Sequence, residues 1–531
     1  MMLGSLVLLA GLFWLLLRSP AQNRATTELF FYCAAGVREA VEPIVADYAE
    51  QYGVTVQVQY GGSNTLLSQI EVGRVGDLYL AADESYTTLA REKDLVQEII
   101  PVAVMRPVIA VRQGNPGSIQ TIDDLLRDDV RVALGNPGQA AVGKLARELL
   151  SASGQWEQLA EHASVLKPTV HDVANDIKIG SVDAGIIWDA VVAQYPDLEA
   201  IRVPELDPGA ARISVGILNS ADVPTEALRF ARYLTARDRG LIEFTKRGYE
   251  VVDGDVWADE PQLVFYAGAV NRRALEPVIE AFSQREGVSV QTVYNGCGIL
   301  TAQMRSILDQ HTSGFPDFYM ACDQYYLDEV EELFQDAVQI STTDIVIVVQ
   351  PGNPQNIETL DDLARPGVRV VLGQPEQCTI GVLSRRLLDD AGLYEKVLAE
   401  NVKSQTTSSA LLIPAITTGA ADAVLAYRSD TLAESDKFDV ITIDSPLAHA
   451  VQPYGIARTS EFKHLGRRLL EAIARSRESF EAAGFAWQLA GPSAPPDDDS
   501  PGENAEATDT SPAVPAESNA ASRATLGADG T

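Results

Sequence analysis

Two short loops carry the side chains in this sequence that are best suited to binding or reaction chemistry. Residues 60–66 read YGGSNTL, and residues 294–300 read YNGCGIL. Each loop follows a β-rich run and opens a segment with a helical pattern, where free backbone N–H groups can hold an oxyanion. The first loop places the hydroxyl of Ser63 at this point, and the second places the thiol of Cys297. A hydroxyl donates a hydrogen bond, whereas a thiol can also be oxidised or bind a soft metal.

The chain contains four cysteines: Cys33, Cys297, Cys322 and Cys378. Four cysteines among 531 residues are too few to form a disulfide framework. Cys33 lies in the first predicted strand, and we interpret it as a small buried hydrophobic residue.

The two loops belong to a long internal repeat. Residues 31–62 align without gaps to residues 265–296, and the match returns in three later blocks. These blocks pair 77–83 with 317–323, 114–137 with 352–375, and 182–190 with 421–429. The offset of 234 residues between Ser63 and Cys297 is far longer than a solenoid unit, so each copy is predicted to be a whole domain.

Each copy alternates short β-branched strands with amphipathic helices. This pattern predicts an α/β fold with a mostly parallel sheet covered on both faces. A copy of this length can divide into two lobes with a ligand cleft between them. The strands expected in the first copy are 29–34, 54–60, 77–82, 131–135 and 184–188, with helices at 40–52 and 143–151; the segments expected to cross between lobes are 107–116 and 211–220, and in the second copy 344–354 and 451–460.

Composition changes at both ends of the chain. Residues 1–17 are uncharged and apolar, and Ser19-Pro20-Ala21 gives a small-residue cleavage pattern, so 1–26 is predicted to be a signal peptide or N-terminal membrane anchor. Residues 491–531 are rich in Pro, Ser, Ala and acidic residues, which predicts a disordered tail. The predicted domains between them are 27–256 and 257–490.

The formal net charge of −33 argues against a nucleic-acid or anionic-membrane surface. It does not argue against a small anion, which local dipoles can hold whatever the net charge. Enzyme motifs such as Gly-x-Ser-x-Gly, His-Glu-x-x-His and a Walker loop do not occur in the sequence. Asp83 and Asp323 recur at aligned positions, but helix capping explains them without catalysis. We therefore expect neither an enzyme nor a cofactor.

The motifs YCAAGVREA, YGGSNTLLSQI, GDLYLAAD, ALGNPGQAAVG and AGIIWDA together resemble the periplasmic molybdate-binding protein family, the substrate-binding components of molybdate and tungstate ABC importers. The resemblance covers residues 28–252 and, more loosely, 262–488. It implies two tandem type II periplasmic-binding-protein-like domains, each bilobed around a central ligand cleft. It also implies an extracytoplasmic protein, periplasmic or anchored to the inner membrane, with a small oxyanion ligand and an ABC permease partner.

The family holds a tetrahedral dianion with neutral donors only. Carried over to the first copy, the donor positions are Gly36, Ser63, Val142, Val173 and Trp188. Gly36 replaces a serine and Trp188 replaces a tyrosine, which leaves the identity of the anion open. In the second copy the same positions are Val270, Cys297, Ile380, Leu412 and Tyr427.

The resemblance also brings Cys322 and Cys378 to the second cleft, beside Cys297. Three interpretations stay open for these cysteines. They can be packing residues of a domain that no longer binds ligand, Cys297 and Cys322 can form a disulfide, or all three can bind a soft metal or a thiophilic oxyanion.

We therefore expect a solute-binding protein that captures a molybdate-like or tungstate-like oxyanion for an ABC importer. The alternative is a ligand sensor or scaffold that uses the same modules without transport, or a cysteine-dependent binding module in the second domain.

Overall fold

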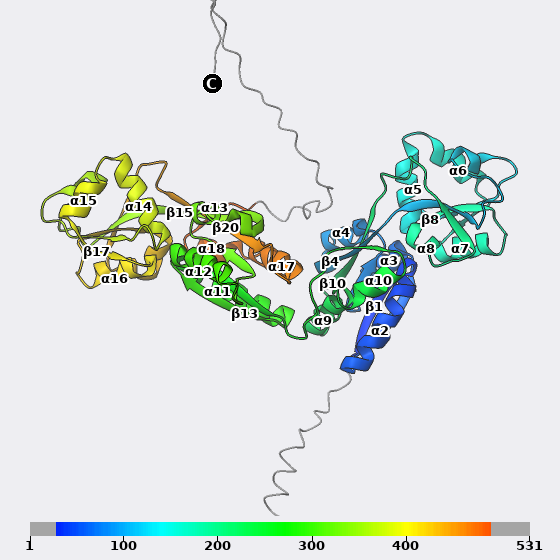
Figure 1. Cartoon of the computed structure of the whole chain (residues 1–531), viewed down its shortest axis with the longest axis horizontal. Coiled ribbons are helices and arrows are strands. Elements are labelled where there is room, and N and C mark those ends of the chain that lie inside the picture. Colours follow the sequence, from blue (N-terminus) through cyan, green and yellow to red (C-terminus); the bar gives the residue numbers. More distant parts are fainter. Residues whose placement is uncertain (1–27, 490–531) are drawn as a thin grey trace, which may run out of the picture. The chain divides into compact units, whose positions relative to one another are not determined.

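The computed structural model describes residues 28–489 (Figure 1). The predicted signal or anchor segment and the predicted acidic tail lie outside these residues. No helix between residues 28 and 489 is long and apolar enough to cross a membrane.

Each repeat contains two lobes, and each lobe of the first repeat is built on its own sheet. The first sheet has the strand order β11-β4-β10-β3-β1-β2, and the second has the order β7-β6-β8-β5-β9. The strands are β1 (Glu28–Ala34), β2 (Thr55–Gly61), β3 (Leu78–Ala81), β4 (Val96–Met105), β5 (Pro107–Arg112), β6 (Val132–Gly135), β7 (Val165–Lys167), β8 (Ala184–Trp188), β9 (Leu198–Ile201), β10 (Ala211–Leu218) and β11 (Glu250–Val251).

Helices surround both sheets of the first repeat, as Figure 1 shows for the segments coloured blue to green. Those of the first lobe are α2 (Arg38–Tyr52), α3 (Ser63–Gly73), α4 (Glu84–Glu92), α9 (Pro224–Leu234) and α10 (Gly240–Lys246), with the short η1 (Ala35–Val37). Those of the second lobe are α5 (Ala141–Ser151), α6 (Gln155–His162), α7 (Val170–Lys178) and α8 (Asp189–Val192), with η2 (Asp123–Leu126). The strands and helices predicted from the first copy are all present within a few residues.

The second repeat has the same order of elements. Its strands are β12 (Gln262–Gly268), β13 (Ser289–Asn295), β14 (Phe318–Met320), β15 (Phe334–Val349), β16 (Val370–Gly373), β17 (Val402–Thr406), β18 (Ala423–Tyr427), β19 (Asp439–Thr442), β20 (His449–Ala457) and β21 (Ala486–Trp487). Its helices are α11 (Arg272–Glu286), α12 (Cys297–Asp309), α13 (Gln324–Asp328), α14 (Thr379–Asp390), α15 (Tyr394–Glu400), α16 (Leu412–Thr417), α17 (Lys463–Ala474) and α18 (Arg477–Ala482), with η3 (Ala269–Asn271), η4 (Glu331–Leu333), η5 (Leu360–Ala364), η6 (Ser409–Leu411) and η7 (Arg428–Glu434).

The sheets are mixed. β1 pairs in parallel with β2 and β3, as the βαβ pattern predicts, and β6 pairs in parallel with β7 and β8. The antiparallel pairs are β3–β10, β4–β10 and β4–β11 in the first lobe, and β5–β8 and β5–β9 in the second.

The two repeats differ where the chain first crosses between lobes. In the first repeat β4 ends at Met105 and β5 begins at Pro107, whereas in the second repeat the single strand β15 runs through both sheets. Pro107 aligns with Ile345, whose N–H donates to the Ala448 carbonyl at 2.8 Å. Proline has no N–H and cannot continue such a ladder, which accounts for the break. The crossing point of the first repeat is therefore Arg106, just before the segment predicted from the sequence.

Candidate functional site

In the first repeat, the predicted donor positions lie at helix starts or at a strand end. Ser63 is the first residue of α3, Val142 the second of α5, Val173 the fourth of α7, and Trp188 the last of β8. Gly36 lies in η1, between β1 and α2. All five are buried.

Close approaches of the backbone bring these loops together. A Cβ added at Gly36 would lie 3.5 Å from the Trp188 indole, and one added at Gly62 would lie 2.4 Å from the Gln139 carbonyl oxygen and 3.0 Å from that of Pro168. Gly62 precedes α3, whereas Gln139 and Pro168 precede α5 and α7. Glycine at position 62 therefore lets the start of α3 reach two helix starts of the opposite lobe.

Side chains also join the two lobes of the first repeat. The Asn64 amide donates to the Gly138 carbonyl at 2.7 Å, and the Lys144 ammonium donates to the Ser85 hydroxyl at 2.7 Å. Gln194 donates to the Tyr249 hydroxyl at 3.1 Å. The lobes therefore contact each other in a closed arrangement.

The Ser63 hydroxyl is held in place from within its own lobe. It accepts a hydrogen bond of 3.1 Å from the Ala82 N–H, and the Tyr79 hydroxyl donates to the Ser63 carbonyl at 2.8 Å. A hydroxyl has one proton to donate, and this accepted bond leaves that proton available to a ligand.

Two of the predicted backbone donors are already used within their own helical turns. The N–H of Val173 points to the Thr169 carbonyl at 3.5 Å, and the N–H of Leu412 donates to the Ser409 carbonyl. The N–H groups with no partner inside a helix belong to its first turn. The donors of these two loops are therefore better assigned to Val170 and Ser409, a few residues earlier than predicted.

In the second repeat, a narrow cavity lies between the lobes, and we call it the second cleft. It contains about 170 Å³ of space not filled by atoms, but none of it is wide enough for a water molecule. Its lining comes from the starts of four helical segments together with the ends of two strands: Ala269, Asn295, Gly296, Cys322, Cys378, Thr379, Ile380, Ser408, Ser409 and Tyr427.

The predicted residues of the second repeat occupy the same elements as their counterparts in the first. Ile380 and Tyr427 line the second cleft, whereas Val270, Cys297 and Leu412 are buried directly beside residues that line it. The Tyr427 hydroxyl is buried without a hydrogen-bond partner. Burial raises the pKa of Tyr427 well above its usual value, so the group is a neutral donor.

Sequence reasoning missed the hydroxyl groups of the second cleft. Thr379, Ser408 and Ser409 align with Ala141, Thr169 and Val170 of the first repeat. The second repeat therefore lost its loop serine in one lobe but gained hydroxyls at two helix starts of the other lobe. The Thr379 hydroxyl is buried without a hydrogen-bond partner. Comparing the aligned helix starts for gained hydroxyls would have found these residues.

Cys297 and Cys322 lie in contact, with 2.9 Å between their sulfur atoms, and both are buried. The backbone N–H of Cys322 donates to the Cys297 sulfur at 3.1 Å. Burial raises the pKa of the Cys297 thiol, but the nearby Cys322 thiol, Thr379 hydroxyl and Cys322 N–H together outweigh it and lower that pKa. The neighbouring Cys297 sulfur, together with burial, raises the pKa of Cys322. Cys297 is thus the residue of the pair that carries negative charge more readily.

The third predicted cysteine belongs to the other lobe of the second repeat. Cys378 lines the second cleft from the other lobe, and its thiol lies 3.5 Å from the Thr406 carbonyl. Burial raises its pKa to about 11. Between residues 28 and 489, no three His, Cys, Asp or Glu side chains are placed to hold a metal ion. Cys33 is buried in the core, as expected.

The two recurring aspartates are helix caps. Asp83 accepts a hydrogen bond from the Ser85 N–H at the start of α4, and Asp323 accepts one from the Tyr325 N–H at the start of α13. Asp323 also accepts from the Val451 N–H at 3.0 Å. These bonds account for both carboxylates without a catalytic role.

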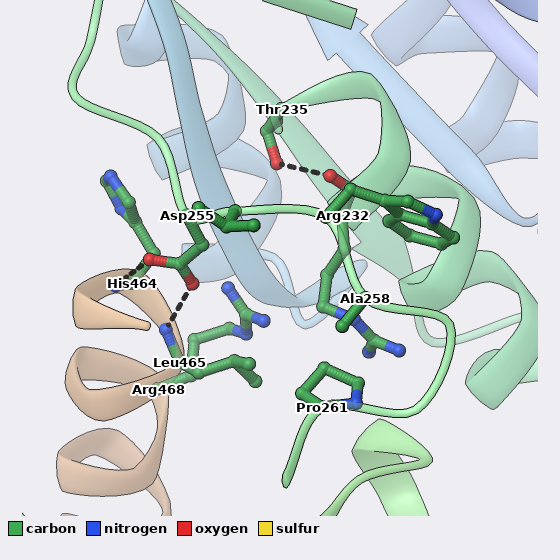
Figure 2. A pocket seen from close by; sticks show the side chains of 10 residues that line it. Arg232, Thr235, Asp255, Ala258, Pro261, His464, Leu465 and Arg468 are labelled. Atoms are coloured by element: carbon green, nitrogen blue, oxygen red, sulfur yellow. Dashed lines mark hydrogen bonds between the residues drawn. The ribbon is translucent and has the colours of Figure 1, made fainter. Parts of the chain in front are cut away.

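A separate pocket lies beside the segment that joins the repeats (Figure 2). Arg232 and Arg468 point into it, and the carboxylate of Asp255 accepts hydrogen bonds from the N–H groups of His464 and Leu465. Beneath it, buried Glu286 accepts hydrogen bonds from both arginines, at 3.2 Å from Arg232 and at 2.7 Å from Arg468. These buried ion pairs join α9, α11 and α17.

Comparison with known proteins supports the assignment of two copies. A family model described as bacterial extracellular solute-binding protein matches residues 29–250 and again residues 263–486. A molybdate-binding protein ModA of Mycobacterium tuberculosis is 29% identical over 233 residues, which are 42% of this chain and 84% of that protein. Among solved structures, the periplasmic molybdate-binding protein of Azotobacter vinelandii is 18% identical with a TM-score of 0.37, covering 42% of this chain and 98% of the other. The sulfate-binding protein SubI of Mycobacterium tuberculosis is 21% identical with a TM-score of 0.35, covering 43% of this chain and 86% of the other.

Proposed function

The chain belongs to the family of bacterial extracellular solute-binding proteins, and from this premise we propose that its first repeat captures a small tetrahedral oxyanion for an ABC importer. The proposed ligand is molybdate-like or tungstate-like. The proposed donors are the Ser63 hydroxyl, the Trp188 indole N–H, and N–H groups at Gly36, Val142 and the first turn of α7. The relatives named for molybdate and sulfate binding support an oxyanion as the ligand class.

The observation that carries the proposal is the meeting of three helix starts around one buried hydroxyl. Ser63, at the start of α3, lies beside loops that open α5 and α7, through the contacts of Gly62 with Gln139 and Pro168. Helix starts offer free N–H groups and a positive dipole end, both of which favour an anion. Neutral donors of this kind bind an anion without a lysine or arginine in the cleft.

The expected affinity follows from the number of donors. About five hydrogen bonds to a charged ligand contribute roughly 1.5–3 kcal/mol each, before the cost of ordering and association is subtracted. A remainder of about 8 kcal/mol corresponds to a dissociation constant near 1 μM. Closure of the lobes over the ligand, followed by docking on a permease, would complete the transport role.

The test is ligand titration of the full chain by calorimetry, with molybdate, tungstate, sulfate and phosphate. Binding of at least one of these anions is expected at a first-repeat site. Ser63→Ala removes one donor to a charged ligand and is expected to raise the dissociation constant by about 10- to 100-fold. Trp188→Phe removes the indole N–H and is expected to weaken binding in the same direction.

Cys297→Ser is the matched control, because Cys297 aligns with Ser63 in the other repeat. This variant is expected to leave the first-repeat affinity unchanged. Full binding by Ser63→Ala, or no heat from any of the four anions, would overturn the proposal.

A further inference from the structure

Three aligned positions changed together between the repeats. The first repeat has Ala34, Ser63 and Ala82, and the second has Gly268, Cys297 and Cys322 at the same places. In both repeats the backbone N–H of the third residue donates to the side chain of the second. This bond is 3.1 Å from Ala82 to the Ser63 oxygen and 3.1 Å from Cys322 to the Cys297 sulfur. The local backbone is thus the same, and the side chains alone differ.

The change to glycine makes room for the two sulfur atoms. A Cβ added at Gly268 would lie 2.2 Å from the Cys322 sulfur and 2.8 Å from the Cys297 sulfur. Both distances are shorter than such contacts allow, so an alanine at this position would force the sulfur atoms or the strand to shift. A single cysteine needs only a packing explanation. Here two cysteines are in contact, and the second repeat has Gly268 where the first has the methyl group of Ala34. The three residues therefore fit together as a pair of thiols with the space that the pair needs.

The surroundings of Cys297 and Cys322 indicate a different role for each thiol. Cys297 is the first residue of α12, where helix N–H groups favour a negative charge, and its sulfur accepts a hydrogen bond from the Cys322 N–H and contacts the Cys322 sulfur at 2.9 Å. Cys322 is the member that lines the second cleft, and it is 4% exposed. Cys297 is therefore suited to be the attacking thiolate, and Cys322 lies within reach as the resolving thiol.

We propose that Cys297 and Cys322 are a redox-active pair that reacts with disulfides in the second cleft. The Cys297 thiolate attacks one sulfur of the disulfide, forms a mixed disulfide and releases the first thiolate. Cys322 then loses its proton to solvent and attacks the Cys297 sulfur, which closes the intramolecular disulfide and releases the second thiolate. The pair loses two electrons, and the external disulfide gains them.

Access to the pair requires the lobes of the second repeat to separate. The closed second cleft has no room for a water molecule, and the Tyr326 hydroxyl donates across it to the Pro375 carbonyl at 3.0 Å. Arg386 of α14 also lies over the Tyr325 ring, 4.9 Å from its centre. Opening of the lobes would break these contacts and uncover Cys322, which lines the cavity, together with the Cys297 sulfur 2.9 Å from it.

The test uses the full chain, fully reduced and then equilibrated in buffers of reduced and oxidised glutathione at pH 8. Free thiols are trapped with N-ethylmaleimide and located by mass spectrometry of peptides. The expected result is that Cys297 and Cys322 lose their free thiols together and become linked to each other. Cys378 and Cys33 are expected to stay reduced, with Cys297 reacting about tenfold or more faster than Cys378.

Variants separate the two roles. Cys322→Ala should stop at a glutathione mixed disulfide on Cys297, and Cys297→Ser should leave Cys322 unmodified. The first repeat supplies a gain-of-function control, because Ala34→Gly/Ser63→Cys/Ala82→Cys rebuilds the pair there and should create a second linked couple.

Two results would overturn the proposal. One is that the native protein keeps both thiols free at every glutathione ratio, while the urea-unfolded chain oxidises. The other is that each cysteine forms a separate mixed disulfide and the two never join. Because none of these measurements involves an anion, the proposal can fail or succeed independently of ligand binding in the first repeat.

Discussion

Gly268→Ala is a direct test of the packing around the two sulfur atoms. The new methyl group would lie 2.2 Å from the Cys322 sulfur, at the buried end of β12. Both sulfurs are held by neighbouring backbone, so relief requires displaced side chains or a shifted strand. Forcing one extra carbon into a filled core costs about 1–3 kcal/mol. For a domain of this size, each kcal/mol corresponds to roughly 2–4 °C in melting temperature.

The assay is differential scanning calorimetry of the full chain with reductant present. Gly268→Ala is expected to lower the transition of the second repeat by about 2–12 °C and to leave that of the first repeat unchanged. The matched background is Cys297→Ser/Cys322→Ala, which gives the second repeat the side chains of the first. In that background the added methyl group should cost almost nothing, because Ala34 is accommodated beside Ser63 and Ala82.

The difference between the two backgrounds measures the coupling between the methyl group and the sulfurs. An equal loss of stability in both would refute the reasoning, since it would assign the cost to the backbone at Gly268 and not to the thiols. A Gly268→Ala protein as stable as the parent would refute it as well.

Two further predictions concern buried charges. Glu286→Gln removes the carboxylate that joins Arg232 and Arg468, and it should destabilise the protein by about 3–5 kcal/mol in urea unfolding at pH 7. The control is Glu329→Gln at the exposed pair with Arg305, which should change the free energy of unfolding by less than about 1 kcal/mol. Burial raises the pKa of Glu286, but the charge of Arg468 and its hydrogen bond outweigh burial and lower that pKa. The stabilisation by the Glu286 carboxylate is therefore present above about pH 5 and is lost as the pH falls further. An equal loss of stability in Glu286→Gln at pH 3.5 and at pH 7 would contradict this pH dependence. Burial raises the pKa of Asp430 to about 6, above its unfolded value, so the native state loses stability as the pH rises from about 4 to about 6 and keeps that penalty at higher pH. Asp430→Asn should therefore raise the melting temperature at pH 7.5 but not at pH 4.

Much of the fold could be predicted because the repeat supplied each pattern twice. Strands such as 184–188 and helices such as 40–52 follow from local periodicity, which tertiary contacts did not override. The start of β5 depended instead on one residue. Pro107 breaks the strand in the first repeat, whereas Ile345 lets β15 pass through both sheets. The pattern of apolar residues alone does not predict this difference.

The site was less predictable than the fold. Loop positions such as Ser63 and Cys297 could be placed at helix starts from the sequence, but which N–H groups remain free depends on caps that form only in three dimensions. The Val173 N–H, for instance, is directed at the Thr169 carbonyl. The hydroxyls of Thr379 and Ser409 come from a lobe distant in sequence from Cys297, and only the folded chain brings them to one cavity.

The charge state of Cys297 leads to a last prediction about ligand binding in the second cleft. In the reduced protein, the Cys322 N–H bond and the start of α12 favour a thiolate at the position where the first repeat offers the neutral Ser63 hydroxyl. A unit charge about 4 Å from an anion contributes roughly 4 kcal/mol of repulsion per unit of ligand charge at an effective dielectric constant of 20. A dianion would meet roughly twice that repulsion, which cancels most of a micromolar affinity. The reduced chain is therefore expected to bind one molybdate or tungstate at pH 8. Cys297→Ser restores a neutral donor, so this variant is expected to bind a second equivalent. Two equivalents bound by the reduced parent protein would show that Cys297 carries no charge in the cleft.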